Sequence, residues 1–367
     1  MRILHTEWSD GWGGQERRIM SDLTGMARRG HTVYLVTRRH ARIGEEARRA
    51  GIPVYDLPLR SNLDLVSVVR LAWLLRALRI DIVNTHSGVD SWIGGLAAKL
   101  ARTPALVRTR HLHLPLKRSW RNFVHYLQDR LVTCGETMRA FLIRDYGFPE
   151  REVVSIPTGI DFSSFVPRRD RAAVRQALGV PEDAYLVLMV GIVRAVKRHE
   201  VALRAVHLLR GRVANIRLLA AGDGPMIEDM RRLAEELGIA GQVGFLGQRD
   251  DVADLMGAAD CLLLTSRSEG IPQAVTQALG SGLPVVATAV GGVPELVRDG
   301  VTGLLVPAEN PAAVADALER LARHPEFAQQ LARQGREHAL AHYSLHAMLD
   351  ATEREYLSLL RAQGLSS

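Results

Sequence analysis

Cysteine is scarce in this sequence, aromatic residues are few, and long apolar runs are absent. The 367 residues include two cysteines, and Phe, Trp and Tyr together make up 5% of the chain. Cys134 and Cys261 each lie in a short apolar segment, which is typical of small buried residues in a reducing compartment rather than of a disulfide or a metal site. No apolar run reaches the ~18 residues of a membrane-spanning helix, and the N-terminus lacks the apolar segment of a signal peptide. We therefore expect a cytoplasmic protein that does not span the membrane.

The sequence also lacks the motifs of several kinds of site. It contains no Asp-x-Asp pair, no P-loop motif, no cluster of Cys and His residues and no Ser-His-Asp order. The glycines near the N-terminus, Gly11, Gly13 and Gly14, do not complete the dinucleotide fingerprint G-x-G-x-x-G, because Glu16 stands at its last position.

The composition is that of a globular protein whose charge is unevenly distributed. With 47% hydrophobic and 24% charged residues, the chain is long enough for two domains of ordinary size. Residues 1–160 hold 25 Lys and Arg against 15 Asp and Glu, whereas residues 161–367 hold 22 against 25. We therefore expect only the first half to meet an anionic partner, and both nucleic acid and anionic lipid fit this charge.

Strand-like apolar runs and amphipathic helical patterns alternate along both halves. The first half predicts strands at 2–6, 32–37, 81–86, 105–110, 130–134 and 153–157, and helices at 14–29, 64–79, 89–101, 117–130 and 136–145. After a turn-rich segment and a polar linker at 168–170, the pattern restarts with strands at 185–191, 216–222, 242–246, 261–265, 284–288 and 303–306, and helices at 199–210, 225–237, 251–257, 272–281 and 311–323. The tail, 325–364, is predicted to be helical throughout. This alternation predicts two successive doubly wound parallel sheets of the α/β class, with a cleft at their carboxyl ends.

The most informative stretch is 265–307. It begins at a strand end, passes through a turn that contains Glu269 and Gly270, and enters a helical pattern. A strand followed by a glycine turn and a helix offers backbone N–H groups and a positive helix end to an anion. Glu269 and Gln277 are eight positions apart, about two helical turns along one side, and could hold a polyhydroxylated, phosphate-bearing ligand. The simpler alternative is a tight strand–helix turn with a solvated Glu269.

A second cluster of charge follows the first strand of the second half. Arg194 and Lys197 come just after Gly191 and before a helical pattern. Cations at such a point suit the α- and β-phosphates of a leaving nucleoside diphosphate.

Together these motifs resemble the nucleotide-sugar site of the family 4 glycosyltransferases (GT4), which are retaining enzymes of the GT-B architecture. The resemblance covers nearly the whole chain and rests on the segments 269–272, 277–278, 282–287, 291–295 and 300–303. It implies two Rossmann-like domains facing each other across a cleft: 1–165 for the acceptor, 166–345 for the nucleotide sugar, and a helix at 346–367 that crosses back to the first domain. Two positions depart from the family: Gln277 replaces a second Glu, and Ile192 replaces an Arg whose role we assign to Arg194.

The resemblance also implies roles for individual residues. Arg194 and Lys197 would steady the departing diphosphate, Glu269 would accept hydrogen bonds from the sugar hydroxyls, and His111 would complete the catalytic set. The implied donor-binding residues are Gly13, Gly14, Gly247, Gln248, Arg249, Gly270, Ile271, Pro272, Gln273, Thr276 and Gln277. For Gly13 and Gly14 the alternative is a turn that requires positive φ.

Histidines at two strand ends of the first half are expected on the acceptor side. The family's T-x-H motif matches Thr109 and His111, so His111 inherits the catalytic role, while His86 and His113 are assigned to the acceptor side. An imidazole near the anomeric carbon can hydrogen-bond a sugar hydroxyl or steady charge in the transition state. The choice between His111 and His113 stays open, as does a structural role for either.

The segment 115–130 is both basic and aromatic. Lys117, Arg118, Trp120 and Arg121 are predicted to contact the inner face of an anionic membrane; the alternative is a solvated amphipathic helix. Because no stacking platform or reading-helix motif accompanies the charge, nucleic acid is not an expected partner.

We therefore expect a retaining, metal-independent glycosyltransferase without a cofactor. It would move a sugar from a nucleoside diphosphate, UDP being favoured over GDP, to a glycan or lipid-linked acceptor in cell-surface polysaccharide or lipopolysaccharide synthesis. In this reading Arg194 and Lys197 balance the charge that an Asp-x-Asp-held metal would otherwise neutralise. The alternatives are a GT-B nucleotide-sugar epimerase, a noncatalytic sugar-nucleotide binding protein and a basic nucleic-acid binder.

Overall fold

The computed structural model describes residues 1–111 and 120–365, and its chain divides into two compact units. The first unit holds Met1–Gly159 together with the segment that begins at Leu345, and the second holds Ile160–Ser344. This division falls a few residues before the boundary expected after 165 and close to the one expected after 345.

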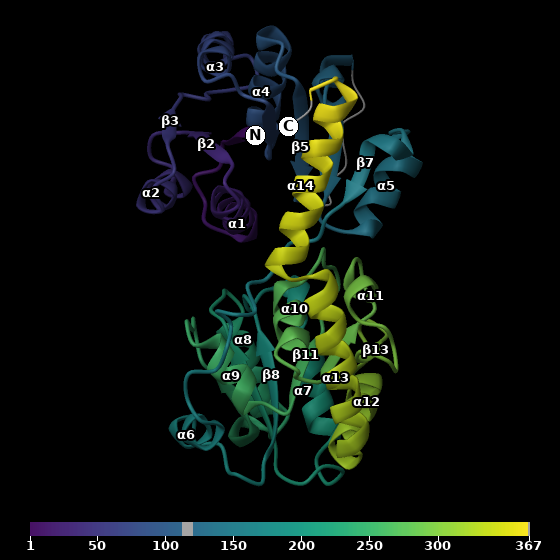
Figure 1. Cartoon of the computed structure of the whole chain (residues 1–367). Helices are drawn as coiled ribbons and strands as arrows, with labels where there is room; N and C mark the ends of the chain where they lie inside the picture. The colour runs from purple at the N-terminus through teal and green to yellow at the C-terminus, as the bar shows by residue number, and fades with distance from the viewer. Residues whose placement is uncertain (112–119, 366–367) are drawn as a thin grey trace. The chain divides into compact units, whose positions relative to one another are not determined.

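The first unit is built on a seven-stranded parallel sheet with the order β3-β2-β1-β4-β5-β6-β7 (Figure 1). Its strands are β1 (Arg2–Glu7), β2 (Thr32–Thr37), β3 (Val54–Asp56), β4 (Ile82–Thr85), β5 (Ala105–Arg110), β6 (Arg130–Thr133) and β7 (Val153–Ser155). The strand order reverses between β1 and β4, where Ile3 lies opposite Val33 on one side and Ile82 on the other. In a doubly wound sheet, ligands bind at the carboxyl ends of the strands beside such a reversal.

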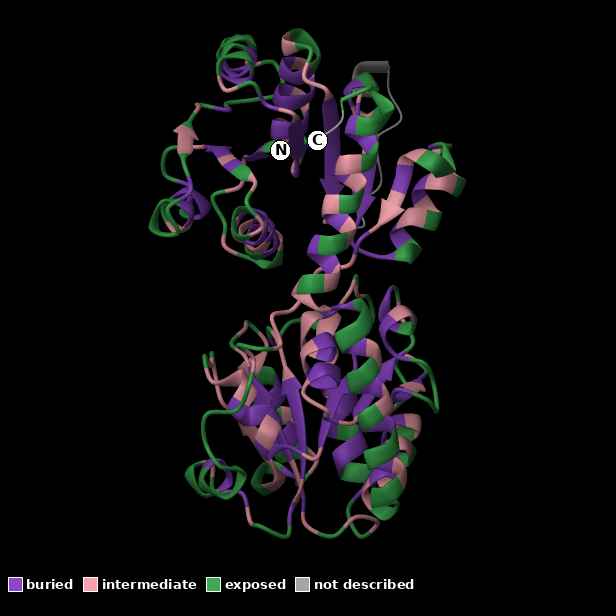
Figure 2. Cartoon of the chain, in the orientation of Figure 1, coloured by how far each residue is buried: buried purple, intermediate pink, exposed green. Residues whose placement is uncertain are grey.

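Helices cover both faces of this sheet. They are α1 (Gly14–Arg28), α2 (Arg42–Arg49), α3 (Leu65–Ala77), α4 (Gly88–Ala101), α5 (Glu136–Tyr146) and α14 (Leu345–Ala362), with short 3-10 turns at Trp120–Tyr126 and Glu150–Glu152. Successive side chains of a strand point to opposite faces, so Ile3 belongs to one hydrophobic core and Leu4 to the other. Figure 2 shows the central strands buried, the edge strands β3 and β7 only partly buried, and the outer sides of the helices exposed.

The C-terminal helix α14 is an integral part of the first unit. Met348, Leu349, Tyr356, Leu359 and Leu360 are buried in the same core as β1 and α1. Polar contacts fix the helix further: Arg29 pairs with Asp350 at 2.6 Å and Glu353 at 2.7 Å, and the Asn84 amide donates to the Tyr356 hydroxyl at 2.8 Å. The first unit is therefore assembled from both ends of the chain.

The second unit contains a six-stranded parallel sheet with the order β10-β9-β8-β11-β12-β13. Its strands are β8 (Tyr185–Val190), β9 (Ile216–Ala221), β10 (Val243–Phe245), β11 (Cys261–Leu264), β12 (Val285–Thr288) and β13 (Leu304–Val306). The strand order reverses between β8 and β11, with Val187 opposite Cys261 and Leu218.

The helices of the second unit again lie on both faces of the sheet (Figure 1). They are α6 (Arg171–Ala177), α7 (His199–Leu208), α8 (Ile227–Glu236), α9 (Val252–Ala258), α10 (Gln273–Gly280), α11 (Val293–Leu296), α12 (Pro311–Arg323) and α13 (Pro325–His342), with 3-10 turns at Ala195–Lys197 and Ala240–Gln242. Cys261 on β11 and Cys134 after β6 are both buried, free thiols.

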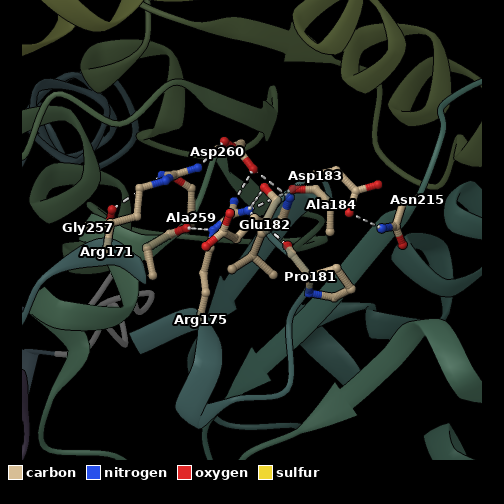
Figure 3. A network of polar contacts seen from close by, with 12 residues as sticks. Arg171, Arg175, Pro181, Glu182, Asp183, Ala184, Asn215, Gly257, Ala259 and Asp260 are labelled. Carbon is tan, nitrogen blue, oxygen red and sulfur yellow. Dashed lines mark hydrogen bonds and ion pairs between the residues drawn. The ribbon is translucent and has the colours of Figure 1, made fainter. Parts of the chain in front are cut away.

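An arginine network fastens α6 to the edge of the second sheet where the strands begin (Figure 3). Arg175, which is 3% exposed, donates to the carbonyl oxygens of Ala184 and Ala258, each at 3.0 Å, and pairs with Asp260 at 2.6 Å. Arg171 reaches the other oxygen of the Asp260 carboxylate at 2.6 Å. Since the protein's own oxygens accept from these guanidinium groups, the network serves to hold α6 in place.

Several sequence predictions of secondary structure were wrong or incomplete. The tail is not helical throughout, because α13 ends at His342 and α14 begins at Leu345. The described part of the helix expected at 117–130 is a 3-10 turn, Trp120–Tyr126. The elements α2, β3, α6 and α11 were not predicted; each is eight residues or shorter and carries little periodic signal. Asp170, assigned to a linker, caps α6 by accepting from the Ala172 N–H.

Candidate functional site

Three of the polar residues singled out from the sequence, Lys197, Glu269 and His86, lie just after the strands at which the order of each sheet reverses. In the second unit, β8 is followed by Gly191 and the turn that holds Lys197, and β11 is followed by Thr265, Ser266 and Glu269. Adjacent parallel strands end at the same edge, so the topology places these two loops side by side.

Lys197 and Glu269 contact each other directly at this edge. Lys197 Nζ lies 2.7 Å from Glu269 Oε1, and the side chains are 17% and 12% exposed. The Ser266 hydroxyl donates to the same carboxylate oxygen at 2.5 Å. Thr265 Oγ1 holds the Lys197 loop by donating to the backbone oxygen of Lys197 at 3.0 Å. These side-chain contacts therefore join the loop after β8 to the loop after β11.

Glycine allows the backbones around this pair to approach closely. A Cβ on Gly291 would lie 1.9 Å from the backbone oxygen of Glu269, and Gly291 has a φ of +54. A Cβ on Gly222, after β9, would lie 2.0 Å from the backbone oxygen of Gly191. Only glycine fits at either position. The loop of Gly291 therefore lies close to the loop that carries Glu269, and the loop of Gly222 lies close to the loop that carries Lys197.

The other predicted donor residues of the second unit have varied surroundings. Arg194 is exposed, and Arg249 is engaged by Asp251 through Nε at 2.8 Å and Nη2 at 2.6 Å. Gly247 has a φ of +65 and accepts through its oxygen from Gly222 N at 2.8 Å. Thr276 is buried, and its hydroxyl donates to the Pro272 oxygen at 3.3 Å.

The remaining donor candidates lie around the start of α10. Gly270 and Gln248 are exposed; Ile271, Gln273 and Gln277 are half-buried; and Pro272 is buried. Because α10 begins at Gln273, Glu269 lies in the preceding loop, and its predicted helical spacing to Gln277 does not apply.

In the first unit, three histidines form a hydrogen-bonded chain at the corresponding edge. His5 Nδ1 lies 2.9 Å from His86 Nε2, and His86 Nδ1 lies 3.0 Å from His111 Nε2. At the far end, His111 Nδ1 is 3.7 Å from the Sγ of Cys134. His5 lies in the second half of β1, and His86 and His111 directly follow β4 and β5.

Cys134 lies at the far end of this chain and has contacts to Arg110 and Arg18 as well as to His111. Its thiol donates to the Arg110 oxygen at 3.2 Å and accepts from Arg18 at 3.2 Å. When the thiol proton points to the Arg110 oxygen, the sulfur can accept from His111 Nδ1–H, and a consistent set of neutral tautomers then has His86 Nδ1–H donating to His111 and His5 Nδ1–H donating to His86. Both nitrogens of His111 are thus used by the protein, and a sugar hydroxyl would compete with His86 for Nε2.

Burial keeps all three rings neutral. It lowers the pKa of His5 to about 3. It also lowers the pKa of His86 and His111 well below the usual value, helped in both cases by neighbouring positive charge. His5 Nε2 has no hydrogen-bond partner in the described part of the chain.

A buried carboxyl group lies at the end of β1, beside the glycine loop. Burial, with a smaller contribution from Asp90, raises the pKa of Glu7 to about 8. Glu7 accepts from Ser9 N at 2.7 Å and from Gln15 Nε2 at 2.5 Å. In the same loop, Gly13 donates through its N–H to Glu16 Oε2 at 2.7 Å and has a φ of −123. The alternative of a positive φ at Gly13 was therefore wrong.

Part of the predicted first-domain surface lies outside the described residues. This applies to His113, Lys117 and Arg118 and to the side chains of Trp120 and Arg121. Within residues 1–111 and 120–365, no helix has the length and apolar character needed to cross a membrane.

Sequence reasoning missed several residues that shape the two edges. Cys134 was predicted only as a buried thiol, and Ser266, His5 and Glu7 were not singled out, although all four lie in or just after the last residues of a strand. The available signal was a group of polar residues directly after apolar ones, such as His5, Thr6 and Glu7 after Ile3 and Leu4.

Two Rossmann-like parallel-sheet units define the GT-B class of glycosyltransferase fold. Comparison with known families agrees with this class: residues 12–164 match "Glycosyltransferase Family 4", and residues 170–338 match "Glycosyl transferases group 1". The D-inositol 3-phosphate glycosyltransferase of Mycobacterium tuberculosis (strain ATCC 25618 / H37Rv) is 31% identical over 349 residues, which cover 85% of this chain and 71% of that protein. The chain belongs to the GT4 family and is a glycosyltransferase.

Solved structures share the fold over almost the full length. A glycosyltransferase from Rickettsia africae ESF-5 matches with a TM-score of 0.88 at 20% identity, over 98% of both chains. Anabaena HepE in complex with UDP matches with a TM-score of 0.85 at 20% identity, over 98% of this chain and 100% of that one.

Proposed function

We propose that this glycosyltransferase transfers a sugar from a nucleoside-diphosphate donor with retention of configuration and without a metal ion. The donor would be held by the second unit, and the acceptor, a glycan or a lipid-linked sugar of cell-surface polysaccharide or lipopolysaccharide synthesis, by the first. The observation that carries the proposal is the contact of Lys197 with Glu269 at the strand reversal between β8 and β11.

In this mechanism the fixed charge of Lys197, joined by the exposed Arg194, stabilises the diphosphate as the glycosidic bond breaks. Glu269 accepts hydrogen bonds from the hydroxyls of the transferred sugar. Retention without an evident carboxylate nucleophile favours attack by the acceptor hydroxyl from the face that the diphosphate leaves. UDP is the favoured nucleotide of the donor. HepE, which shares the fold, is known in complex with UDP and with UDP-glucose.

A thermal-shift panel of UDP, GDP and their sugars tests the donor assignment. A ligand that binds only the folded state raises the melting temperature, and we expect the largest rise with UDP or a UDP-sugar. Absence of a shift with every nucleotide would contradict the proposal.

Lys197→Ala tests the charge assignment. Loss of one fixed charge at the leaving group should lower transfer, or slow donor hydrolysis in the absence of acceptor, by about 10²–10³-fold, with the far-ultraviolet circular dichroism unchanged. Arg204→Ala, an exposed cation on α7, is the matched control and should keep full activity. Turnover by Lys197→Ala close to that of the wild type would remove Lys197 from the mechanism.

A further inference from the structure

Helix α3 and the turn before it expose a concentrated group of apolar side chains. Leu63, Leu65, Val66, Val69 and Trp73, here called the α3 face, are between 58% and 79% exposed. Leu65, Val69 and Trp73 follow one another at four-residue spacing, so they lie in one row along the helix. The opposite side of α3 is buried against the first sheet and α4, so core packing does not require the α3 face to be apolar.

The surroundings of the α3 face are positively charged. Residues 57–80 contain four arginines and one acid, Asp64. That acid is used internally, since it caps α3 by accepting from Ser67 N at 3.0 Å and also accepts from Arg60 N at 3.1 Å. The Arg76 guanidinium donates to the backbone oxygen of Leu100 near the end of α4. The side chain of Leu100 is itself apolar and exposed.

A basic cavity adjoins the α3 face at the carboxyl ends of β2 and β3. It has a volume of about 600 Å³ and is lined by Asp10, Arg38, Arg39, His40, Asp56, Leu57, Pro58 and Arg70. Both acids are already neutralised, Asp10 by Arg38 and Asp56 by Arg48 at 2.6 Å. Among the residues that the structure describes, no ion pair engages Arg39, His40 or Arg70. The cavity therefore offers unpaired positive charge to an anion.

Arg70 connects the two features. It lines the cavity and stands four residues after Val66 and three before Trp73, so on the helix surface it neighbours both. An apolar face continuous with a cationic cavity matches an amphiphile that carries an anionic head group.

We propose that the α3 face and this basic cavity form one docking surface for an anionic phospholipid bilayer. The apolar side chains enter the boundary between head groups and acyl chains, where tryptophan is favoured, and the cavity takes a head-group phosphate. A second copy of the chain fits less well: a two-fold interface brings the same patch against itself, and here it would oppose arginine to arginine without a free acid. This surface shares no residue with the segment around Lys117–Arg121, and its binding of lipid does not depend on the transfer reaction.

Co-sedimentation of the full chain with vesicles tests the proposal. We expect binding to vesicles that contain phosphatidylglycerol, weakening as salt is raised, and little binding to pure phosphatidylcholine. Val66→Ser combined with Val69→Ser should weaken binding at least tenfold by removing buried apolar area. Arg39→Gln combined with Arg70→Gln should cause a similar loss. Leu208→Ser combined with Leu340→Ser, two exposed apolar residues of the second unit, is the control and should bind as the wild type does.

Lipids with brominated acyl chains locate the contact. Tryptophan fluorescence should be quenched on binding, and the quenching should fall in Trp73→Phe. The UDP-induced thermal shift should be the same in all these variants, which shows that the fold and the donor site are intact.

Three results would overturn the proposal. One is full binding to phosphatidylglycerol by the Val66/Val69 or the Arg39/Arg70 variant. Another is quenching that persists in Trp73→Phe and disappears in Trp120→Phe. The third is a dimer in solution that the Val66/Val69 variant breaks.

Discussion

At the residue scale, the central feature is the direct contact between Lys197 and Glu269. The contact is 2.7 Å long, and both side chains are largely shielded from water. A diphosphate must therefore compete with Glu269 for the ammonium group, while the sugar hydroxyls must compete with Lys197 and Ser266 for the carboxylate.

Glu269→Gln should separate binding from turnover. Removing a negative charge that competes for Lys197 should strengthen binding of UDP itself several-fold, whereas transfer from the sugar nucleotide should fall by about tenfold or more. Calorimetric titration with UDP and a turnover assay would measure the two effects. If UDP affinity and turnover fall together, Glu269 acts by holding the loop in shape.

The buried histidines predict a loss of stability in mild acid. The pKa of His5 is about 3 in the folded chain and about 6.5 unfolded, so between these values the unfolded state binds more protons and stability falls as pH falls. In urea unfolding between pH 7 and 5.5, His5→Gln should lose less stability than the wild type, by about 1.4 kcal/mol per pH unit below 6.5.

The quantity to compare is the pH dependence of the unfolding free energy in the variant and in the wild type. The wild-type value alone is not enough, because Glu7 changes stability with pH in the direction opposite to His5. Its folded pKa of about 8 makes stability fall as pH rises from 4.5 to 8. His324→Gln, an exposed histidine, should show the wild-type slope, and an equal slope for His5→Gln would contradict the burial argument.

At the element scale, glycine turns control how closely the loops approach. Gly291, which follows β12, lies against the backbone oxygen of Glu269, so the loop after β12 supports the loop after β11.

Gly291→Ala should therefore damage the donor site, whereas Gly300→Ala should not. The first substitution places a Cβ 1.9 Å from a backbone oxygen and should destabilise the protein by about 3 kcal/mol, with loss of the UDP-induced thermal shift. Gly300 has a φ of +68 but no atom within 4 Å of a new Cβ, so only conformational strain of about 1–2 kcal/mol is expected. Equal behaviour of the two variants would contradict the contact.

At the scale of the whole molecule, the chain leaves the first unit, completes the second and returns. The second unit is continuous in sequence, whereas the first needs α14 to fill its core. The two units should therefore differ in their ability to fold alone.

A fragment spanning 160–344 should fold and keep a thermal shift with UDP. A fragment spanning 1–159 should lack a cooperative melting transition, because α14 supplies five buried side chains to its core. Joining 345–365 to it through a flexible linker should restore the transition. Cooperative melting of 1–159 alone, followed by circular dichroism, would show that α14 is dispensable.

The alternation of apolar runs was enough to predict the two parallel sheets, since buried parallel strands require near-continuous apolar segments. It missed β3, which has three residues, and α2, α6 and α11, because short elements depend on contacts with distant residues. The break at Tyr343–Ser344 was also missed: Tyr343 is fixed by its hydroxyl donating to the Glu295 oxygen at 2.9 Å and by its own oxygen accepting from Ile160 N at 2.8 Å.

The sequence by itself determined the fold class and the family, because strand ends and motif spacing are local properties of the chain. Only the tertiary structure decided that Lys197 contacts Glu269 and that Ser266 shares the carboxylate. It also decided that Cys134 lies at the end of the chain of His5, His86 and His111, and that the α3 face has no partner within the described chain. Each of these features depends on contacts between residues far apart in sequence, or on which side of a helix packs against the core and which side stays exposed. Local patterns do not contain that information.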